Sequence, residues 1–466
     1  MAAVREIDGP RPNAVILGVQ LQGVSDDAFE GSLQELARLA DTLGLKVIGR
    51  VTQKRSALVT ASVVGAGKLH ELAKHTGGSG VIPAYRPPGK DKDAEPAEPE
   101  PPLAQDEEQD ESDAKPTVQV SDKATIVLVD HDLTPSQTRN LEKATGAEVL
   151  DRSMVILSIF QRHARTREAR MQVEIAQLSY MAPRLREAGA GQDRQRGGIG
   201  GKGQGETALE LDRRKIRERI AELRKELEIL KREADTRRAR RLGPETSTIA
   251  LVGYTNAGKS SLMRALTGDE VYVADQLFAT LDTTVRVLKP ETKPRILVTD
   301  TVGFIKKLPH DLVASFRSTL EEAKDAALLL HVVDAADPAF RDQLQVTRTV
   351  LDEIDASKSP TLLVLNKADK LSVEQREALA QEFPGAAVMS SRNADDVREL
   401  HARIVRHFED TMEETELFVP YSEQRKVALL HERARVLEER YDEHGATVRV
   451  RAPSGILAAL RSELGT

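Results

Sequence analysis

One eight-residue segment constrains the fold of this chain more than any other, because it has the spacing Gly-x-x-x-x-Gly-Lys-Ser. The residues are Gly253-Tyr254-Thr255-Asn256-Ala257-Gly258-Lys259-Ser260. The apolar and β-branched run 248–252 precedes it, and a helical pattern starts at Ser261. This strand-to-helix context predicts a P-loop, in which backbone amides and the helix N-terminus converge on phosphate oxygens. We therefore expect an α/β domain that binds a nucleotide through residues 253–261.

Two residues of the loop have separate predicted roles: Lys259 neutralises the β- and γ-phosphates, and the Ser260 hydroxyl is a ligand of Mg²⁺. A second motif, Asp300-Thr301-Val302-Gly303, follows the predicted strand 295–299. An acid at the end of that strand can hold Mg²⁺ through water, and the glycine amide can contact the γ-phosphate. We predict that all four residues belong to the nucleotide site and that Lys259 and Gly303 act in catalysis.

Two motifs further along the chain specify the base. The predicted strand 360–365 leads into Asn366-Lys367-Ala368-Asp369, and the next strand leads into Ser390-Ser391-Arg392. In GTPases the Asp of the first motif accepts two hydrogen bonds from guanine N1 and N2, which adenine cannot supply. A backbone amide after Ser390 is expected to meet guanine O6. The ordered set of motifs predicts a protein that binds GTP and GDP and hydrolyses GTP.

Composition narrows the class of protein. The chain has no cysteine, which excludes disulfides and thiolate metal sites. No stretch approaches the length of an apolar membrane span, and residues 1–10 lack the basic and apolar regions of a signal peptide. We expect a cytoplasmic, monomeric protein with no integral membrane segment.

Strand and helix patterns alternate in the first 150 residues. Strand patterns occupy 14–19, 46–51, 124–129 and 147–150, with helical patterns at 32–43 and 135–145. The alternation predicts an N-terminal parallel α/β domain over residues 1–150. A segment of about residues 76–122 interrupts it, and within this segment 91–113 hold 11 acids against one Lys. Such a segment buries too little apolar surface to offset chain entropy, so we predict a disordered acidic, Pro-rich insertion.

The next region, 151–242, is predicted to be an antiparallel helical hairpin. One apolar stripe is Met171, Ile175, Leu178 and Met181, and a heptad-like stripe is Ile216, Ile220, Leu223, Leu227 and Leu230. A Gly-rich loop, 197–206, should lie at the tip. After it we expect a G domain over 243–411 and a small α+β domain over 412–466. In that last domain we predict a helix from Ser422 to Glu439 and a strand near 447–450.

Charge is distributed unevenly. Residues 152–241 hold 23 Lys+Arg against 13 Asp+Glu. A surplus of this kind indicates either a nucleic-acid-binding surface or only a solvated helical face.

Motifs outside the nucleotide site resemble those of the HflX family of ribosome-associated GTPases over nearly the whole chain. They are Thr52-Gln53-Lys54-Arg55, Leu133-Thr134-Pro135-Ser136-Gln137, Arg139-Asn140-Leu141-Glu142, Asp151-Arg152, Ala164-Arg165-Thr166-Arg167-Glu168, the 197–206 loop and Phe278-Ala279-Thr280-Leu281-Asp282. The resemblance implies an α/β multidomain protein: an N-terminal α/β domain, a helical hairpin, a P-loop Ras-like G domain and a small C-terminal domain. It also implies binding to the large ribosomal subunit and its rRNA, with GTP-dependent splitting of stalled ribosomes. No DNA partner is expected.

The same resemblance guides the assignment of switch I, the loop whose threonine must reach both Mg²⁺ and the γ-phosphate. Largely on the family pattern we choose Thr280 over Thr283 and Thr284, which we expect in the following strand. Thr280 is thus a predicted Mg²⁺ ligand and catalytic residue. Residues Phe278, Ala279, Leu281 and Asp282 are predicted nucleotide contacts.

The chain departs from the family pattern in two places: the acidic insertion is not typical, and Thr283 stands where proline is usual. A third segment, 63–68, ends in Gly65-Ala66-Gly67-Lys68 and imitates the end of a P-loop. It lacks the upstream glycine and the following Ser or Thr, so we interpret it as a turn that starts a helix. ATP binding by the N-terminal region stays an open question.

Phe304 stands where Ras-like proteins carry a glutamine that positions the attacking water. A phenyl ring cannot do this, so hydrolysis is expected to be slow until a partner, expected to be the ribosome, supplies ordered groups. The alternative is that Phe304 only packs while another residue of the chain positions the water. Asn256 matches the asparagine of potassium-activated GTPases, which makes K⁺ a candidate cofactor beside Mg²⁺.

The Gly-rich loop is the predicted RNA contact. Arg194, Arg196 and Lys202 flank or occupy a segment with little side-chain bulk, which suits close approach to phosphates. The leading hypothesis is a GTPase that splits or rescues stalled ribosomes. The alternatives are a ribosome-assembly GTPase that acts on the free large subunit and a non-catalytic, nucleotide-dependent RNA-binding switch.

Overall fold

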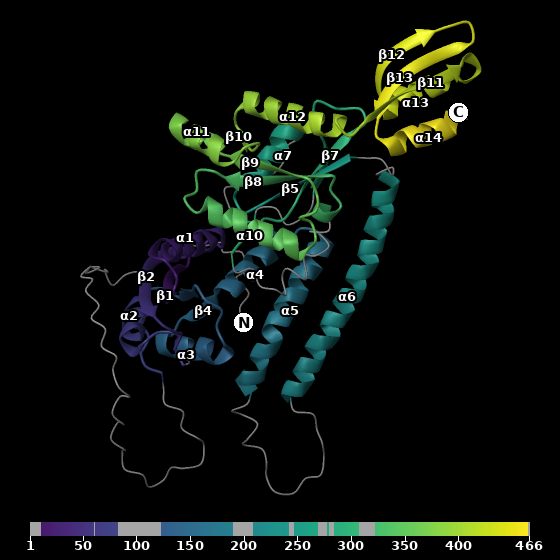
Figure 1. Ribbon diagram of the computed structural model, residues 1–466. Coiled ribbons are helices and arrows are strands. Elements are labelled where there is room, and N and C mark those ends of the chain that lie inside the picture. Colours follow the sequence, from purple (N-terminus) through teal and green to yellow (C-terminus); the bar gives the residue numbers. More distant parts are fainter. Residues whose placement is uncertain are drawn as a thin grey trace, which may run out of the picture. The chain divides into compact units, whose positions relative to one another are not determined.

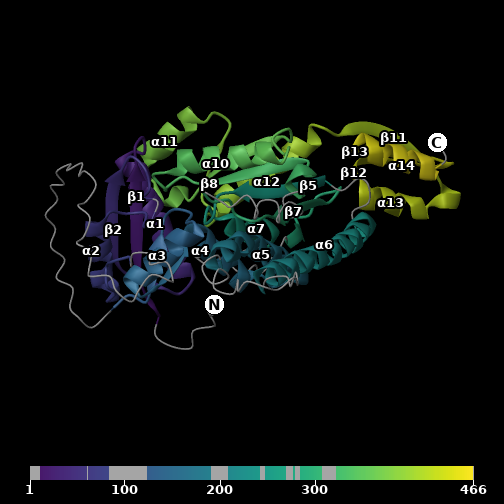
Figure 2. The same ribbon diagram turned by 90° about the horizontal axis from the view of Figure 1, so that it is seen from below.

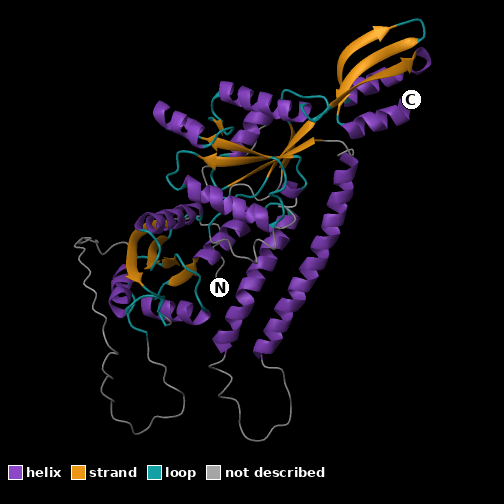
Figure 3. Cartoon of the chain, viewed as in Figure 1, coloured by secondary structure: helices purple, strands orange, loops and turns teal. Residues whose placement is uncertain are grey.

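The computed structural model describes residues 11–59, 61–82, 123–189, 208–241, 247–268, 277–278, 284–306 and 322–464 (Figure 1). Three sheets with their covering helices and a pair of long helices make up this part of the chain (Figure 3). Two compact units share it: the first holds 1–155 and 183–213, and the second holds 156–182 and 214–466. The predicted class, an α/β protein with several sheets, is confirmed.

The first unit is built on a four-stranded parallel sheet with the order β2-β1-β3-β4. Its elements are β1 (Asn13–Leu21), α1 (Asp26–Thr42), β2 (Lys46–Arg55), α2 (Ala66–Thr76), β3 (Ile126–Val129), α3 (Pro135–Thr145) and β4 (Glu148–Asp151). One face of the sheet packs against Leu72 of α2 and Leu141 of α3. Gly65 is the N-cap of α2, so the P-loop-like segment is the helix start that we expected.

The first residues of the segment predicted as an insertion, about 76–122, are folded. Residues 77–82 belong to the folded unit, because the Gly80 amide donates to the Ala144 carbonyl at 2.8 Å and Ile82 packs against the core. A Gly in the left-handed region ends α2, and the chain then turns back onto α3. Residues 83–122 lie outside the described part of the chain.

A buried ionic cluster explains the Asp151-Arg152 motif. The Arg152 side chain is 1 % exposed and pairs with Asp130 at 2.8 Å and with Glu35. Asp151 is likewise buried and pairs with Arg184 at 2.6 Å. Removal of one partner would leave a buried charge with too little compensation, which costs up to several kcal/mol. The motif is therefore part of the core of this unit.

Three helices follow: α4 (Arg152–His163), α5 (Arg167–Gly189) and α6 (Ala208–Arg241). α5 and α6 lie side by side (Figures 1 and 2). Met171, Ile175 and Leu223 form the buried seam between them, flanked by Leu178, Ile220, Leu227 and Leu230, members of the two predicted stripes. The Gly-rich loop lies outside the described residues.

The second unit contains a six-stranded sheet with the order β10-β9-β8-β5-β7-β6, in which only β6 is antiparallel to its neighbour. Its strands are β5 (Ser247–Gly253), β6 (Thr284–Val287), β7 (Ile296–Asp300), β8 (Leu328–Asp334), β9 (Thr361–Asn366) and β10 (Ala387–Val388). Helices α7 (Lys259–Thr267) and α12 (Ala394–Glu409) cover one face, and α10 (Phe340–Glu353) and α11 (Val373–Glu382) pack on the other. All motif-bearing strand ends of the parallel strands meet at one edge.

The C-terminal region is a three-stranded antiparallel sheet, β11-β13-β12, with two helices on one face. Its elements are β11 (Glu413–Pro420), α13 (Arg425–Arg433), β12 (Arg435–Tyr441), β13 (Gly445–Ala452) and α14 (Ser454–Leu464). The predicted helix from Ser422 to Glu439 is wrong in its last third, because α13 ends at Arg433 and 435–441 pairs with β13. Tertiary pairing overrides the helical propensity of Leu and Glu in that segment. No helix in the described part of the chain is long and apolar enough to cross a membrane.

Candidate nucleotide-binding site

The P-loop connects β5 to α7, and two of its glycines are required by close contacts. Gly253 has φ +151°, and a Cβ on it would lie 2.1 Å from the Val332 carbonyl oxygen. Gly258 has φ +95°, and a Cβ there would lie 2.3 Å from Nδ2 of Asn366. Any side chain at either position would displace a neighbouring strand end. The predicted Gly-x-x-x-x-Gly pattern is therefore a packing requirement as well as a phosphate-binding one.

The loop is hydrogen-bonded to the segment after Asp300. The Thr255 amide donates to the Phe304 carbonyl at 2.8 Å, and the Phe304 amide donates to the Gly253 carbonyl at 3.1 Å. The Lys306 amide donates to the Tyr254 hydroxyl at 2.7 Å. These bonds bring the two predicted phosphate motifs, 50 residues apart, into one site. Thr301 has a structural role, because its buried hydroxyl donates to the Leu251 carbonyl at 2.6 Å.

Lys259 lies buried in the loop and points back at it. Its Nζ donates to the carbonyl oxygens of Gly253 at 3.1 Å and Tyr254 at 2.9 Å. Burial lowers the pKa of Lys259 to about 8, although the Asp300 carboxylate opposes the shift. A buried ammonium that donates to neutral carbonyl oxygens gains strongly from a phosphate anion.

The residues predicted for Mg²⁺ fit that ion. The Ser260 hydroxyl donates to Oδ2 of Asp300 at 2.9 Å, and Asp300 is fully buried at the end of β7. A hydroxyl and a carboxylate are hard oxygen donors of the kind that Mg²⁺ takes together with water and phosphate oxygens. The third predicted ligand, Thr280, lies outside the described residues, as do Ala279, Leu281 and Asp282.

Gly303 and Phe304 both lie next to the P-loop, but Gly303 lies against the loop residues whereas the Phe304 side chain lies in the hydrophobic core. A Cβ on Gly303 would lie 2.9 Å from Cγ2 of Thr255 and 3.1 Å from Nζ of Lys259, so only glycine fits there. Phe304 is 2 % exposed and packs in a core cluster with Ala250 and Leu329. Its ring is thus part of the hydrophobic core, and it has no group that can bind water.

At the base end, Asn366 links three segments. Its Nδ2 donates to the Ala257 carbonyl at 2.9 Å, and its Oδ1 accepts from the Ser391 amide at 3.0 Å. Lys367, in the left-handed region at φ +62°, extends Nζ to the Asn256 carbonyl at 2.8 Å. Both residues therefore join the P-loop to the base motifs instead of projecting into solvent.

Asp369, the predicted guanine ligand, is held by the second base motif. The Ser390 hydroxyl donates to Oδ1 of Asp369 at 2.6 Å, and this bond is the main cause of a lowered pKa at Asp369. The Arg392 amide donates back to the Ser390 hydroxyl at 3.2 Å. The carboxylate is thus ionised and oriented at neutral pH, as recognition of guanine N1–H and N2–H requires.

Two acids of the site were not predicted. Asp334 at the end of β8 pairs with Lys367 at 2.7 Å, and Asp396 in the first turn of α12 accepts from the Ser390 amide at 2.8 Å. A signal existed for Asp334, because it ends a buried strand as Asp300 does. Asp396 is one of two acids in a helix first turn, which is common for reasons unrelated to ligands.

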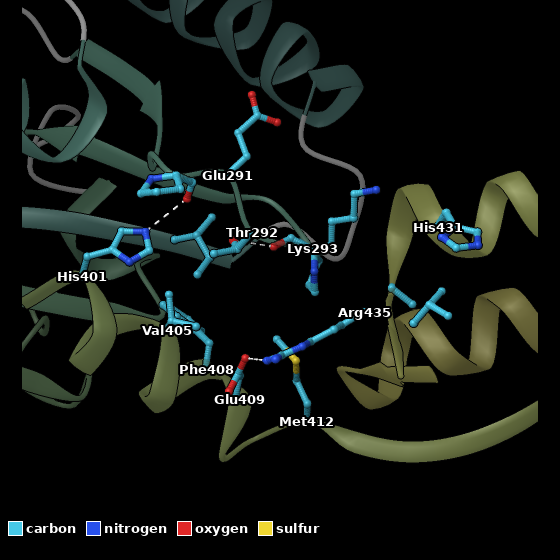
Figure 4. Close-up of a pocket in the computed structure, with 15 residues that line it drawn as sticks. Glu291, Thr292, Lys293, His401, Val405, Phe408, Glu409, Met412, His431 and Arg435 are labelled. Atoms are coloured by element: carbon cyan, nitrogen blue, oxygen red, sulfur yellow. Dashed lines mark hydrogen bonds and ion pairs between the residues drawn. The ribbon is translucent and has the colours of Figure 1, made fainter. Parts of the chain in front are cut away.

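A cavity of about 590 Å³ lies elsewhere in the second unit, between the β6–β7 loop, α12 and the C-terminal region (Figure 4). Lys293, His401 and Arg435 are among its polar lining residues. Arg435 pairs with Glu409, and His401 bonds the Pro290 carbonyl at 3.1 Å. No nucleotide motif contributes to the lining, so this cavity is separate from the P-loop site.

Three family models match the chain. The one described as "GTP-binding GTPase N-terminal" matches 30–81 and 113–161, "GTP-binding GTPase Middle Region" matches 163–241, and "50S ribosome-binding GTPase" matches 248–367. Together they match residues of both units and end at residue 367.

Relatives match over nearly the full length. The GTPase HflX of Gluconacetobacter diazotrophicus is 52% identical, with 98% of this chain and 99% of the relative covered. The GTPase HflX of Caldanaerobacter subterraneus subsp. tengcongensis is 37% identical, with 98% and 95% covered. The GTPase HflX of Escherichia coli is 42% identical, with 71% and 78% covered. Since such identity extends over the ordered nucleotide motifs, the chain belongs to the HflX family of GTPases and is an enzyme that binds and hydrolyses GTP.

Proposed function

We propose that this GTPase acts on the large ribosomal subunit, that the subunit stimulates its hydrolysis, and that the GTP-bound form splits or rescues stalled ribosomes. The partner is supported by the description of the matched G-domain model, "50S ribosome-binding GTPase". The need for a partner is supported by the chemistry of the site, and one observation carries it: Phe304 is buried in the core.

That observation bears on the attacking water. In Ras-like GTPases a glutamine just after the Asp-x-x-Gly motif orients the water, and groups from a partner then stabilise the transition state. Here the residue is a phenylalanine whose ring packs beside Ala250 and Leu329. The packing favours the interpretation that Phe304 is a core residue, so another group must orient the water. We propose that a partner supplies it, and a different residue of this chain is the alternative.

The residues of the site have distinct proposed tasks. Lys259 transfers its hydrogen bonds from the loop carbonyls to the β- and γ-phosphates, and the Gly303 amide contacts the γ-phosphate. Ser260, Thr280 and, through water, Asp300 would hold Mg²⁺, which neutralises charge that develops on the phosphates. Asp369 recognises guanine, while Ser390 keeps its carboxylate in place.

RNA contact is proposed for the loop residues Arg194, Arg196 and Lys202. The described parts of α5 and α6 support this location indirectly, because several of their arginines are already paired with acids. Arg167 pairs with Glu226 at 2.8 Å, and Arg219 pairs with Glu174 at 2.9 Å. Arginines paired in this way offer less charge to phosphates than unpaired cations would.

Hydrolysis assays test the function. Multiple-turnover GTP hydrolysis should accelerate by at least about tenfold with large subunits and not with small subunits. Splitting is then measured on intact ribosomes with GTP, by light scattering or sedimentation. Stimulation without splitting would favour the assembly GTPase, and no turnover in any condition would favour the non-catalytic switch.

The RNA contact is tested by replacing Arg194, Arg196 and Lys202 together with alanine and measuring co-sedimentation with large subunits. The matched control replaces Arg217, Arg224 and Lys225, three exposed cations of α6, and so removes the same charge. We expect only the loop variant to lose binding and stimulation. Equal losses in both variants would mean that net charge, and not the loop, determines binding.

A further inference from the structure

The residue that precedes the predicted switch I threonine by two positions has an unusual backbone. Phe278 is 3 % exposed and has φ +58°, in the left-handed region. A bulky side chain rarely adopts this conformation, which persists only where surrounding contacts hold it. The observation raises the question of what holds Phe278 in place.

Two side chains of α4 contact it. The ring of Phe160 lies edge-to-face against the Phe278 ring, with centroids 4.5 Å apart and planes at 72°. Nδ1 of His163 lies 2.9 Å from the Phe278 carbonyl oxygen. The Phe160 contact holds the Phe278 side chain, and the His163 contact holds the Phe278 backbone.

The imidazole must be the donor in the second contact, because a carbonyl oxygen can only accept. Burial lowers the pKa of His163, and the nearby Arg162 and Arg165 act in the same direction, while the bond to Phe278 opposes the shift. The ring is therefore neutral at pH 7 and carries its proton on Nδ1.

Phe160 and His163 lie three positions apart on α4, so they occupy the same side of that helix. We propose that they are positioning residues for GTP hydrolysis: α4 holds Phe278 and thereby the backbone that leads to Thr280. The proposal rests on the proposed role of Thr280 in binding Mg²⁺ and the γ-phosphate. Phe278 is the one residue of the predicted switch I motif that Phe160 and His163 are seen to contact in the described part of the chain, so their proposed effect on hydrolysis runs through Phe278.

The proposal separates two properties of the enzyme. Hydrolysis of GTP needs Thr280 at the γ-phosphate, whereas GDP lacks that phosphate and is held by the P-loop and the base motifs. Loss of the anchor should therefore lower kcat and leave GDP affinity unchanged. A purely structural role would instead lower thermal stability and change both properties or neither.

The experiment compares His163→Ala with His163→Asn in the full chain, without ribosomes. The asparagine Nδ2 can donate a hydrogen bond from about the position of imidazole Nδ1. We expect His163→Ala to lower single-turnover hydrolysis about tenfold, since small misplacements of catalytic groups have large effects on rate. His163→Asn should recover most of the rate, and both variants should bind GDP within about twofold of the unmodified protein.

Two further variants keep the test decisive. Phe160→Leu preserves apolar volume but removes the ring contact, and it should also lower the rate with GDP affinity intact. His407→Ala is the matched control, because His407 makes a similar ring contact with Phe408 on α12, away from the nucleotide motifs. It should change neither property.

Thr280→Ala, measured in parallel, distinguishes the two proposals. If it leaves hydrolysis intact, the assigned role of Thr280 fails. If it abolishes hydrolysis while a folded His163→Ala variant keeps its rate within twofold, the anchor proposal is wrong. A loss of rate together with GDP affinity in His163→Ala would also overturn it, since that pattern indicates general destabilisation.

Discussion

The phosphate end and the guanine end of the site are organised differently. At the phosphate end, the groups that must hold the ligand are bonded to the loop itself or to each other: Lys259 to two carbonyls, and Ser260 to Asp300. At the guanine end, Asp369 is held by Ser390 from the side. Asn366 joins the loops, because its side-chain amide donates to Ala257 and accepts from Ser391.

The difference indicates which end must rearrange. Phosphates and Mg²⁺ have to replace existing hydrogen bonds, so binding at that end reorganises the protein. At the guanine end the existing bonds do not have to break for the base to bind, so we expect recognition there to cost less. We therefore expect substitutions at the phosphate end to affect chemistry and those at the guanine end to affect affinity and selectivity.

The largest expected effect is at Lys259. Lys259→Ala should lower kcat/KM for GTP by about 10³-fold or more, because the β- and γ-phosphates lose their buried cation. Single-turnover GTP hydrolysis at several enzyme concentrations measures this loss of kcat/KM. Lys306→Ala is the control, since Lys306 also lies beside the loop but its ammonium pairs with Asp342 at 2.9 Å. An equal loss in both variants would contradict the assignment.

Asp369→Asn should lower GTP affinity by about 10²- to 10³-fold, because an unmatched polar group at the base is costly. The hydrolysis rate of bound GTP should change little. Xanthosine triphosphate supplies an acceptor where guanine has a donor, and it should recover binding to the variant. If the variant still prefers GTP over xanthosine triphosphate, Asp369 does not recognise the base and the assignment of the guanine end is wrong.

The pH dependence of binding is expected to come from the phosphate end. Lys259 has a pKa of about 8 in the free protein, below the ordinary lysine value, so the side chain is neutral above that pH. Phosphates raise this pKa, so the complex binds one more proton than the free protein. GTP and GDP affinity should therefore fall above pH 8, by up to about tenfold per pH unit. Lys259→Arg stays charged, and its affinity should not fall in that range.

A candidate K⁺ site at Asn256 gives a further test of the phosphate end. The side-chain amide of Asn256 makes no hydrogen bond to other described residues, and its backbone is left-handed at φ +59°. If K⁺ binds there, hydrolysis should be about tenfold faster in K⁺ than in Na⁺, as expected for one added cation near the transition state. Asn256→Ala should remove the difference. Equal rates in both salts for the unmodified protein would exclude a K⁺ role.

The smallest effect is expected at Ser390. Ser390→Ala removes one hydrogen bond to Asp369, worth about 1 kcal/mol, so GTP and GDP affinity should fall about fivefold. The rate at which bound GTP is hydrolysed should stay unchanged, because the base is held equally in the ground and transition states. Isothermal titration for both nucleotides checks this. A loss confined to GTP would mean that the two ends are coupled.

Much of the site could be predicted from local sequence. The P-loop binds phosphate with amides of consecutive residues, so its pattern is contiguous and visible in the chain. The roles of Thr301 and Asn366 could not be predicted in the same way. Both belong to nucleotide motifs, yet the structure uses the Thr301 hydroxyl and both Asn366 amide atoms for protein contacts over 25 to 109 residues.

The sequence motifs alone were sufficient to predict which segments bind the phosphates and which bind the base, that the base is guanine, and that the fold is α/β. Each of these depends on neighbouring residues or on the alternation of strands and helices. Only the tertiary structure established that Phe304 is core, that 435–441 is a strand, and that Phe160 and His163 hold Phe278. The physical reason is the same in each case. Burial and strand pairing depend on partners distant in sequence, and local propensity is weaker than the free energy of those contacts.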